Sequence, residues 1–298
     1  MERITPPLPA TSGGVIQKTV WTFEMIKFSH SIFAVPFALA AMVVATKGRL
    51  GIRIFLLIVG AMVTARSAAM AFNRIVDATI DAKNPRTRMR HIPKGILSKN
   101  FVAGFTLICI ALFFLFCRAI NPMAFALSPI ALAIILGYSF TKRFTSLSHL
   151  WLGLSLGIAP LAASIAVTGE WPWRTLSLGV AVMFWVAGFD IIYATQDADF
   201  DKQTGLHSLV ARFGINKALW ISRGLHLFCT LFLILFGLQN ALGFIYFITV
   251  LVIAAGLFYE QSLVKPNDLS RVNAAFFNTN GIISLLFLAG IILEYLSH

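Results

Sequence analysis

The stretch IFLLIVGAMVTARSAAMAFNRIVDATID (residues 54–81) begins as an apolar segment long enough to span a membrane and ends in a polar, acidic cluster. A second stretch, DIIYATQDADFD (residues 190–201), closes another apolar segment in the same way. Ionisable groups at or near membrane depth are costly, so they commonly mark a functional site. In a chain with only 12 acidic residues, these two clusters indicate both the fold class and the candidate site.

The composition indicates a polytopic, all-α membrane protein. Hydrophobic residues make up 58% of the chain and charged residues 12%, whereas a soluble domain is about one quarter charged. The net charge of +12 would suggest nucleic acid in a soluble chain, but cytoplasmic loops of membrane proteins collect lysine and arginine. We therefore expect a lipid bilayer and no nucleic acid as partner. The three cysteines form neither a zinc motif nor a disulfide framework.

Apolar segments of about 20 residues predict nine membrane spans arranged as one bundle. The predicted ranges are 29–46, 54–72, 101–118, 122–140, 148–168, 175–194, 217–237, 239–259 and 274–295. Residues 1–20 are rich in Pro and Gly and are predicted to be a flexible tail, which leaves 21–298 as a single transmembrane domain.

Charge predicts the orientation of the bundle. The N-terminus and the connectors after even-numbered spans carry most of the lysines and arginines, so we expect them in the cytoplasm of a multi-pass protein of the bacterial inner membrane. Lys47, Arg49 and Arg53 run against this rule. The two long charged connectors, 73–100 and 195–216, follow spans two and six, and together they are called the cap here. Both acidic clusters therefore lie on one face of the membrane.

The spacing of the acidic residues suits a site for Mg²⁺ and a diphosphate. Asn73, Asp77 and Asp81 recur every four residues, which on one continuous helix places them in a stripe with about 6 Å of rise between neighbours. Residues 190, 193, 197 and 201 make a similar stripe, while Asp199 points elsewhere. Mg²⁺ favours a few carboxylates together with phosphate oxygens and water. Two facing stripes would hold a diphosphate through bridging Mg²⁺ ions.

Basic residues complete the predicted site. Arg86 and Arg90 follow the first cluster, and Lys142 and Arg143 follow the fourth span. Arginine suits phosphate because its planar fork binds two oxygens at once. Arg66 lies seven residues before Asn73 on the same predicted helix face, and at that depth it requires an anionic partner.

At these residues the chain resembles the UbiA superfamily of intramembrane aromatic prenyltransferases. The first motif resembles NDxxDxxxD followed by a basic stretch, except that Arg74 stands where an aspartate is usual. The second motif resembles DxxYAxQDxxxD followed by GxxS and RFG, and residues 190–214 match it. The similarity covers about residues 20–215, and the last three spans agree only in hydropathy.

This resemblance implies about nine helices around a central cavity with a cytoplasmic cap, Mg²⁺ as cofactor, and a polyprenyl diphosphate and an aromatic acceptor as substrates. It implies metal binding by Asp77, Asp81, Asp197 and Asp201, and catalytic roles in orienting the acceptor or its proton-accepting group for Asp190 and Tyr193. It implies diphosphate binding by Asn73, Arg66, Arg86, Arg90, Lys142 and Arg143, and acceptor binding by Lys27, His30, Tyr138 and Gln196.

The acceptor, the polyprenyl length and the oligomeric state stay open. The segment QDADFDKQTGLHS (residues 196–208) resembles 4-hydroxybenzoate polyprenyltransferases of quinone biosynthesis. The segment FEMIKFSHSIFAVPFA (residues 23–38) resembles the branch that prenylates 1,4-dihydroxy-6-naphthoate on a menaquinone route. We rank the benzoate first. Haem or chlorophyll side-chain prenyltransferases, CDP-alcohol phosphotransferases and transporters are the alternatives, but the chain lacks the compact phosphotransferase motif, and its acids lie at span ends.

Overall fold

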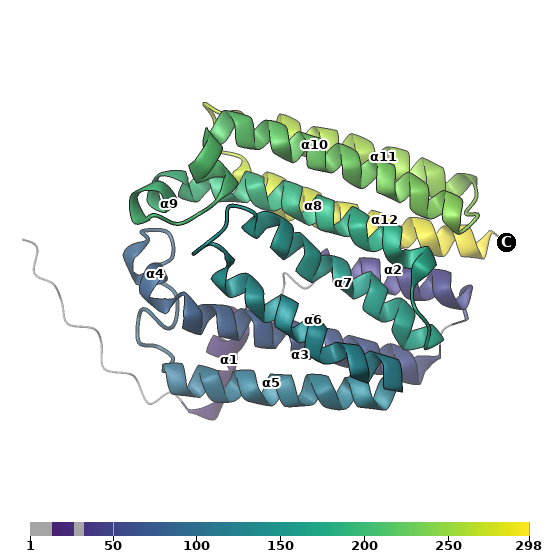
Figure 1. Ribbon diagram of the computed structural model, residues 1–298, viewed down its shortest axis with the longest axis horizontal. Coiled ribbons are helices and arrows are strands. Elements are labelled where there is room, and N and C mark those ends of the chain that lie inside the picture. The colour runs from purple at the N-terminus through teal and green to yellow at the C-terminus, as the bar shows by residue number, and fades with distance from the viewer. Residues whose placement is uncertain (1–13, 27–32, 50, 298) are drawn as a thin grey trace, which may run out of the picture.

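The computed structural model describes residues 14–26, 33–49 and 51–297, and within these ranges the protein is a bundle of helices (Figure 1). The only β-type pairing among them is an isolated bridge between Lys265 and Asp268. The helices of the N-terminal half are α1 (Val15–Met25), α2 (Val35–Thr46), α3 (Ile52–Val76), α4 (Ala78–Lys83), α5 (Lys99–Ile120), α6 (Pro122–Thr141) and α7 (Ser148–Thr168). Those of the C-terminal half are η2 (Trp173–Thr175), α8 (Leu176–Ala194), η3 (Thr195–Asp197), α9 (Ala198–Thr204), α10 (Leu209–Gln239), α11 (Phe244–Ser262), η4 (Ala274–Thr279) and α12 (Asn280–Leu296).

The predicted polytopic bundle is confirmed. Eight helical segments in the described residues are long and apolar enough to cross a membrane, and they match the last eight predicted spans. The first predicted span, 29–46, corresponds to the shorter apolar helix α2, and its residues 29–32 lie outside the described ranges. Helix α1 begins at Val15, inside the range predicted as tail, so the domain boundary at residue 20 stays a prediction.

Helix α8 forms the centre of the bundle. Its sequence LSLGVAVMFWVAGFDIIYA is apolar on all sides, and a helix of that kind is stable only when surrounded. It packs against α7 and α10, and 14 of its 19 residues are buried. Glycines bring α7 and α8 into backbone contact: a Cβ on Gly153 would lie 2.2 Å from the carbonyl oxygen of Met183, and one on Gly157 would lie 2.5 Å from that of Gly179. The two helices are therefore fixed in register.

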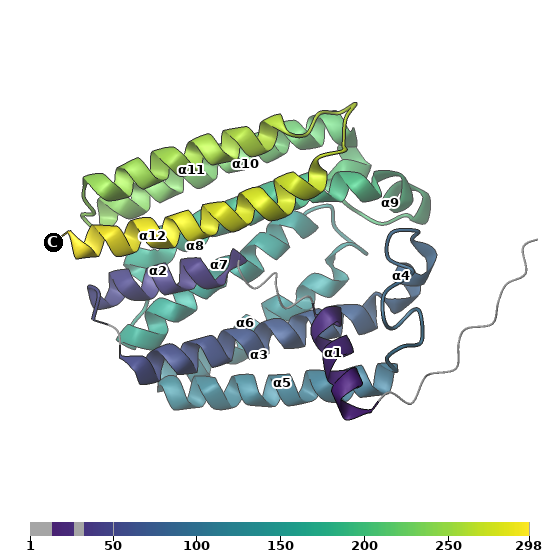
Figure 2. The ribbon, with the colours of Figure 1, turned by 180° about the vertical axis from the view of Figure 1, so that it is seen from behind.

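Both acidic clusters lie where a spanning helix is interrupted, at one end of the bundle. Figures 1 and 2 show α4 and α9 together at this end, opposite the C-terminus. The prediction of one continuous helix through each cluster is wrong. Helix α3 ends at Val76 and α4 starts two residues later, and the tighter 3₁₀ turn η3 separates α8 from α9. The amide of Asp77 still donates to the carbonyl of Asn73 (2.9 Å), so one helical hydrogen bond is kept at the point where the helix is interrupted.

Candidate functional site

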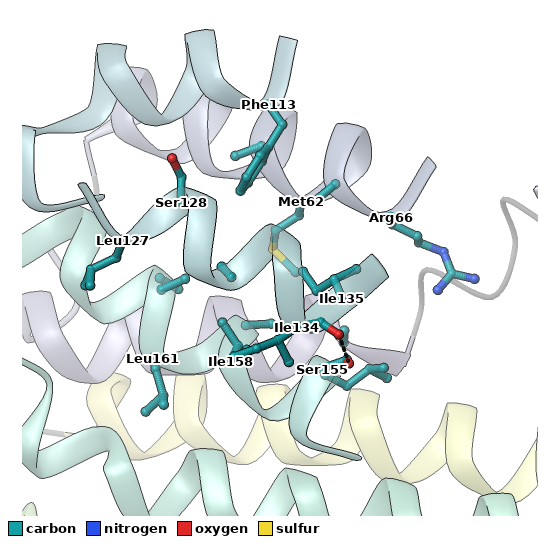
Figure 3. Close-up of a pocket in the computed structure, with 18 of the residues that line it drawn as sticks. Met62, Arg66, Phe113, Leu127, Ser128, Ile134, Ile135, Ser155, Ile158 and Leu161 are labelled. Atoms are coloured by element: carbon teal, nitrogen blue, oxygen red, sulfur yellow. Dashed lines mark hydrogen bonds between the residues drawn. The ribbon is translucent and has the colours of Figure 1, made fainter. Parts of the chain in front are cut away.

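An apolar cavity of about 380 Å³ lies between α3, α5, α6 and α7 (Figure 3). Along α3 its lining runs from Ile58 to Asn73, which at 1.5 Å per residue is about 22 Å, most of the thickness of a hydrocarbon core. Figure 3 shows Ile134, Ile135 and Ile158 among the side chains that face it. The walls therefore form a long, dry compartment suited to a hydrocarbon chain.

One end of this cavity is polar and leads to the first acidic cluster. Arg66, Asn73 and Tyr138 all line it, and the guanidinium of Arg66 extends beyond Ile135, away from the apolar wall (Figure 3). The amide of Asn73 donates to Asp77 Oδ2 at 2.8 Å. A molecule with an apolar tail and an anionic head would therefore find both environments in one continuous site.

The two acidic clusters meet across the cap. The amide of Asn84 donates to Asp197 Oδ1 at 3.1 Å, and its own Oδ1 accepts from the backbone amide of Arg86 at 2.9 Å. Arg86 Nε donates to Asp197 Oδ1 at 2.9 Å, and Nη2 of the same guanidinium donates to Oδ2. Arg86 also lies over the ring of Tyr193 and donates to its hydroxyl at 3.0 Å. These contacts join segments more than 100 residues apart.

Each of the other arginine contacts neutralises one acid of the first cluster. Arg90 Nη1 reaches both oxygens of Asp81, at 2.7 and 2.8 Å. Arg143 Nη2 donates to Asp77 Oδ1 at 3.1 Å and to the carbonyl of Val76 at 2.9 Å, where the last carbonyls of α3 favour a cation. Such charge-assisted contacts fix the positions of the acids.

The charge of Lys142 acts on both clusters at once. It lies close enough to Asp77, Asp197 and Asp201 to influence all three carboxylates electrostatically. Asp201 is 2% exposed, and its Oδ2 has no hydrogen-bond partner in the described residues. The centre of the site thus holds a buried carboxylate oxygen that no arginine occupies.

Outside the membrane spans, the pKa values of Asp77 and Arg86 are both raised, but for different reasons. Burial raises the pKa of the Asp77 carboxyl, the charge of Asp81 raises it further, and Arg143 opposes both. For Arg86, burial alone lowers the pKa, but the hydrogen bond to Asp197 and its charge outweigh burial, so the pKa is raised. Arg86 therefore stays charged at any physiological pH, and Asp77 protonates more readily than an exposed aspartate.

Asp190 lies in the last turn of α8, close to the cap. It is close enough to Tyr138 to act on its hydroxyl group electrostatically, and its Oδ2 is 2.6 Å from Nδ1 of His149. Tyr193 packs against Phe276, and the amide of Gln196 donates to the backbone carbonyl of Tyr193 at 3.3 Å. Asp190 and Tyr193 thus lie one turn apart at the end of α8 that leads into the cap.

The donor set fits Mg²⁺ held together with a diphosphate. Asp77, Asp81, Asp197 and Asp201 carry carboxylate oxygens of the type that Mg²⁺ prefers, and Oδ2 of Asp201 has no hydrogen-bond partner in the described residues. No three His, Cys, Asp or Glu side chains are grouped as a closed metal cage in the part of the chain that the structure describes. An open carboxylate set of this kind is what a metal shared with phosphate oxygens requires.

Sequence reasoning located most of these residues and missed three. The structure brings the predicted acids together with Arg86, Arg90, Lys142 and Arg143, while Lys27 and His30 lie outside the described residues. Arg74, which the motif comparison left out of the metal set because it replaces an acid, is 6% exposed, and its Nη1 is 3.4 Å from Asn73 Oδ1. Asn84 and His149 carry no motif of their own; only their places beside the acidic clusters in the folded chain identify them.

Comparisons with known proteins agree with this geometry. The model of the UbiA prenyltransferase family matches residues 34–286. The chain is 30% identical over 255 residues to a 4-hydroxybenzoate octaprenyltransferase of Vibrio campbellii, covering 86% of this chain and 89% of the relative. It is 33% identical over 235 residues to one from Sodalis glossinidius, covering 78% and 80% respectively.

Solved structures show the same fold. A UbiA homologue of Aeropyrum pernix K1 in its apo form superposes with a TM-score of 0.81 at 32% identity, covering 89% of this chain and 98% of the other. A UbiA homologue of Archaeoglobus fulgidus bound to DMAPP and Mg²⁺ has a TM-score of 0.74 at 20% identity, covering 93% and 99%.

Proposed function

Because the chain belongs to the UbiA prenyltransferase family, we propose that this prenyltransferase moves a polyprenyl group from its diphosphate to a ring carbon of 4-hydroxybenzoate, with Mg²⁺, in respiratory quinone biosynthesis. The observation that carries the proposal is the continuous site, in which an apolar cavity ends at polar residues beside Asp77, and the loop that follows this acid is joined to Asp197 by Asn84 and Arg86. The names of the relatives support 4-hydroxybenzoate as the acceptor.

The cavity binds the polyprenyl tail and the cap binds the diphosphate. Bound Mg²⁺ would neutralise diphosphate oxygens while held by the four aspartates. Arg66, Arg86, Arg90, Lys142 and Arg143 stabilise the charge that develops on the leaving group as the carbon–oxygen bond breaks. The apolar walls exclude water, which would otherwise capture the allylic cation.

The boundary residues then place the acceptor. Tyr138 lines the polar end of the cavity, where the head of the prenyl group would lie, so a phenolic ring bound there faces the cation. Asp190, with Tyr193, orients the ring or the group that takes up the ring proton. Gln196 contributes indirectly, through its hydrogen bond to the backbone of Tyr193. Lys27 and His30 remain candidates for the acceptor carboxylate.

The test is a transfer assay with purified protein in lipid. Polyprenyl diphosphate and Mg²⁺ are supplied with either 4-hydroxybenzoate or 1,4-dihydroxy-6-naphthoate, with an EDTA control, and products are detected by mass. Prenylated benzoate that disappears with EDTA supports the proposal. Prenylated naphthoate alone would move the protein to menaquinone synthesis with the same mechanism, and product from neither acceptor would overturn both assignments.

We also propose that the cap faces the cytoplasm of a bacterial inner membrane, which the charge bias of its connectors supports. The three native cysteines are buried, so a cysteine introduced at exposed Lys202 in α9 gives a clean label. Lys202→Cys should resist a membrane-impermeant thiol reagent in intact cells and react after permeabilisation. Reaction in intact cells would reverse the orientation.

A further inference from the structure

A buried histidine contacts the acceptor side of the site and has no role in the mechanism above. His149 lies in the first turn of α7 and is 0% exposed. Its Nδ1 is 2.6 Å from Oδ2 of Asp190 on α8, and the side chain of Asp190 is 12% exposed. An ionised carboxylate can only accept, so Nδ1 carries the proton and donates to Asp190. A short contact of this kind fixes the direction in which the carboxylate points.

The close packing of α7 on α8 allows this contact. His149, Gly153 and Gly157 recur every four residues, which places them on one face of α7. The two glycines meet the backbone of α8 at Met183 and Gly179, so this face is the one that touches α8. The close approach of the helices brings the ring of His149 within reach of Asp190. Its position is therefore imposed by two helices and not by a mobile loop.

The other nitrogen of the ring has no hydrogen-bond partner in the described part of the chain, and the ring lies near a carboxylate of the predicted metal set. Nε2 of His149 is buried and has no hydrogen-bond partner among the described residues. The ring lies close enough to Asp201 to act on its carboxylate electrostatically, and Oδ2 of Asp201 is also without a partner there. His149 thus contacts Asp190 directly and lies near Asp201, a carboxylate of the predicted metal set.

We propose that His149 is a positioning residue for prenyl transfer, which holds the carboxylate of Asp190 in the direction that the aromatic acceptor requires. This inference rests on the proposed function. A pair that served folding alone would lie equally well in the packed core, whereas this one lies one turn of α8 before Tyr193, whose hydroxyl accepts a hydrogen bond from Arg86 of the cap. A misplacement of about 1 Å at a reacting centre can cost on the order of 100-fold in rate.

The experiment compares His149→Leu with His149→Asn in the transfer assay, using 4-hydroxybenzoate and geranyl diphosphate. Leucine removes the donor and keeps bulk, whereas the asparagine amide can still donate near the position of Nδ1. We expect the leucine variant to lose about 10- to 100-fold in kcat/KM for the acceptor, with KM for the prenyl diphosphate unchanged. The asparagine variant should recover most of that loss.

Two further variants separate positioning from structure. His149→Leu combined with Asp190→Asn should be no slower than Asp190→Asn alone, because both changes remove the same contact. Ser148→Ala is the matched control, since its buried hydroxyl has no partner among the described residues, and it should transfer as wild type does. Thermal unfolding of each variant reports on folding.

Each possible result of these experiments either supports or overturns the proposed role of His149. Equal losses in the asparagine and leucine variants, additive losses in the double variant, or unfolding of both single variants would assign His149 to folding and overturn the proposal. Wild-type transfer by His149→Leu would also overturn it. Absence of transfer by the wild-type protein with either acceptor is a different result, which overturns the proposed function itself.

Discussion

Replacing Asp201 by asparagine tests the metal site at its most informative position. Asp77, Asp81 and Asp197 each hold an arginine, so changing them also disturbs an ion pair of the cap. Asp201 is 2% exposed, forms none of these pairs, and has a buried oxygen without a partner in the described residues. Its substitution therefore removes a proposed metal ligand and leaves the contacts between the two clusters in place.

The size of the expected effect follows from the charge that is lost. Asparagine keeps the shape of the side chain but removes one negative charge facing the cation. Unit charges at an effective dielectric of about 20 attract by about 4 kcal/mol at 4 Å and about 2 kcal/mol at 8 Å. At about 1.4 kcal/mol for each factor of ten, Asp201→Asn should raise the Mg²⁺ concentration for half-maximal transfer by about 30- to 1,000-fold.

The assay titrates Mg²⁺ against product mass at saturating polyprenyl diphosphate, beside thermal stabilisation by Mg²⁺ and pyrophosphate as a readout independent of turnover. Asp199→Asn is the matched control, because Asp199 lies on the same short helix, carries the same charge and is exposed. It should leave the titration within about twofold of wild type. A near-normal Mg²⁺ requirement in a folded Asp201→Asn protein would falsify the assignment of this carboxylate to the metal.

Three further predictions test the fold, the cavity and the acid site. Gly153→Ala should destabilise the protein by about 1–3 kcal/mol, because the new Cβ meets a carbonyl oxygen of α8. Gly104→Ala, which has no atom near the new Cβ, should stabilise α5 by about 0.5–1 kcal/mol. Thermal unfolding in detergent compares the two variants. Ala131→Phe narrows the cavity about 10 Å from Tyr138, so KM should rise at least tenfold for long prenyl diphosphates and little for geranyl diphosphate; equal effects would contradict the tail assignment. Burial raises the pKa of Asp77, so in Mg²⁺-free protein this carboxyl contributes its full stabilisation below the unfolded pKa of about 3.9 and loses it as pH rises through the folded pKa. Asp77→Asn should therefore flatten that part of the pH–stability curve. An unchanged curve would count against a raised pKa at Asp77.

The membrane architecture could be read from the sequence because it depends on patterns that are local. An apolar run of about 20 residues has few alternatives to a spanning helix, and eight of the predicted spans match helices of spanning length. The prediction of helix continuity failed at the acidic clusters, where local backbone geometry competes with helical periodicity. Helical periodicity through Asp77 and Asp197 suggested unbroken helices, but at both residues the chain leaves regular α-helix, where polar side chains offer the backbone other partners.

The partners of each acid could not be predicted from spacing. Arg86 lies nearer in sequence to Asp81 than to Asp197, yet it binds Asp197, because Asn84 folds the loop after α4 toward η3. His149 could not be identified from the sequence for the same reason. A single histidine at the start of an apolar helix belongs to no motif, and its role depends on the approach of α7 to α8. Contacts between distant segments are set by packing, which one sequence does not display.

The arrangement also explains how so many charges can lie beside an apolar cavity. In the structure, three arginines neutralise three of the aspartates, which lowers the cost of burying either charge. When a diphosphate and Mg²⁺ enter, the arginines can turn to phosphate oxygens and the aspartates to the cation, so every charge exchanges one opposite partner for another. Substrate binding then requires little net desolvation. Arginine suits this exchange because its planar fork fits carboxylate and phosphate equally well. By this reasoning the same guanidinium groups stabilise the cap before binding and the leaving group during transfer.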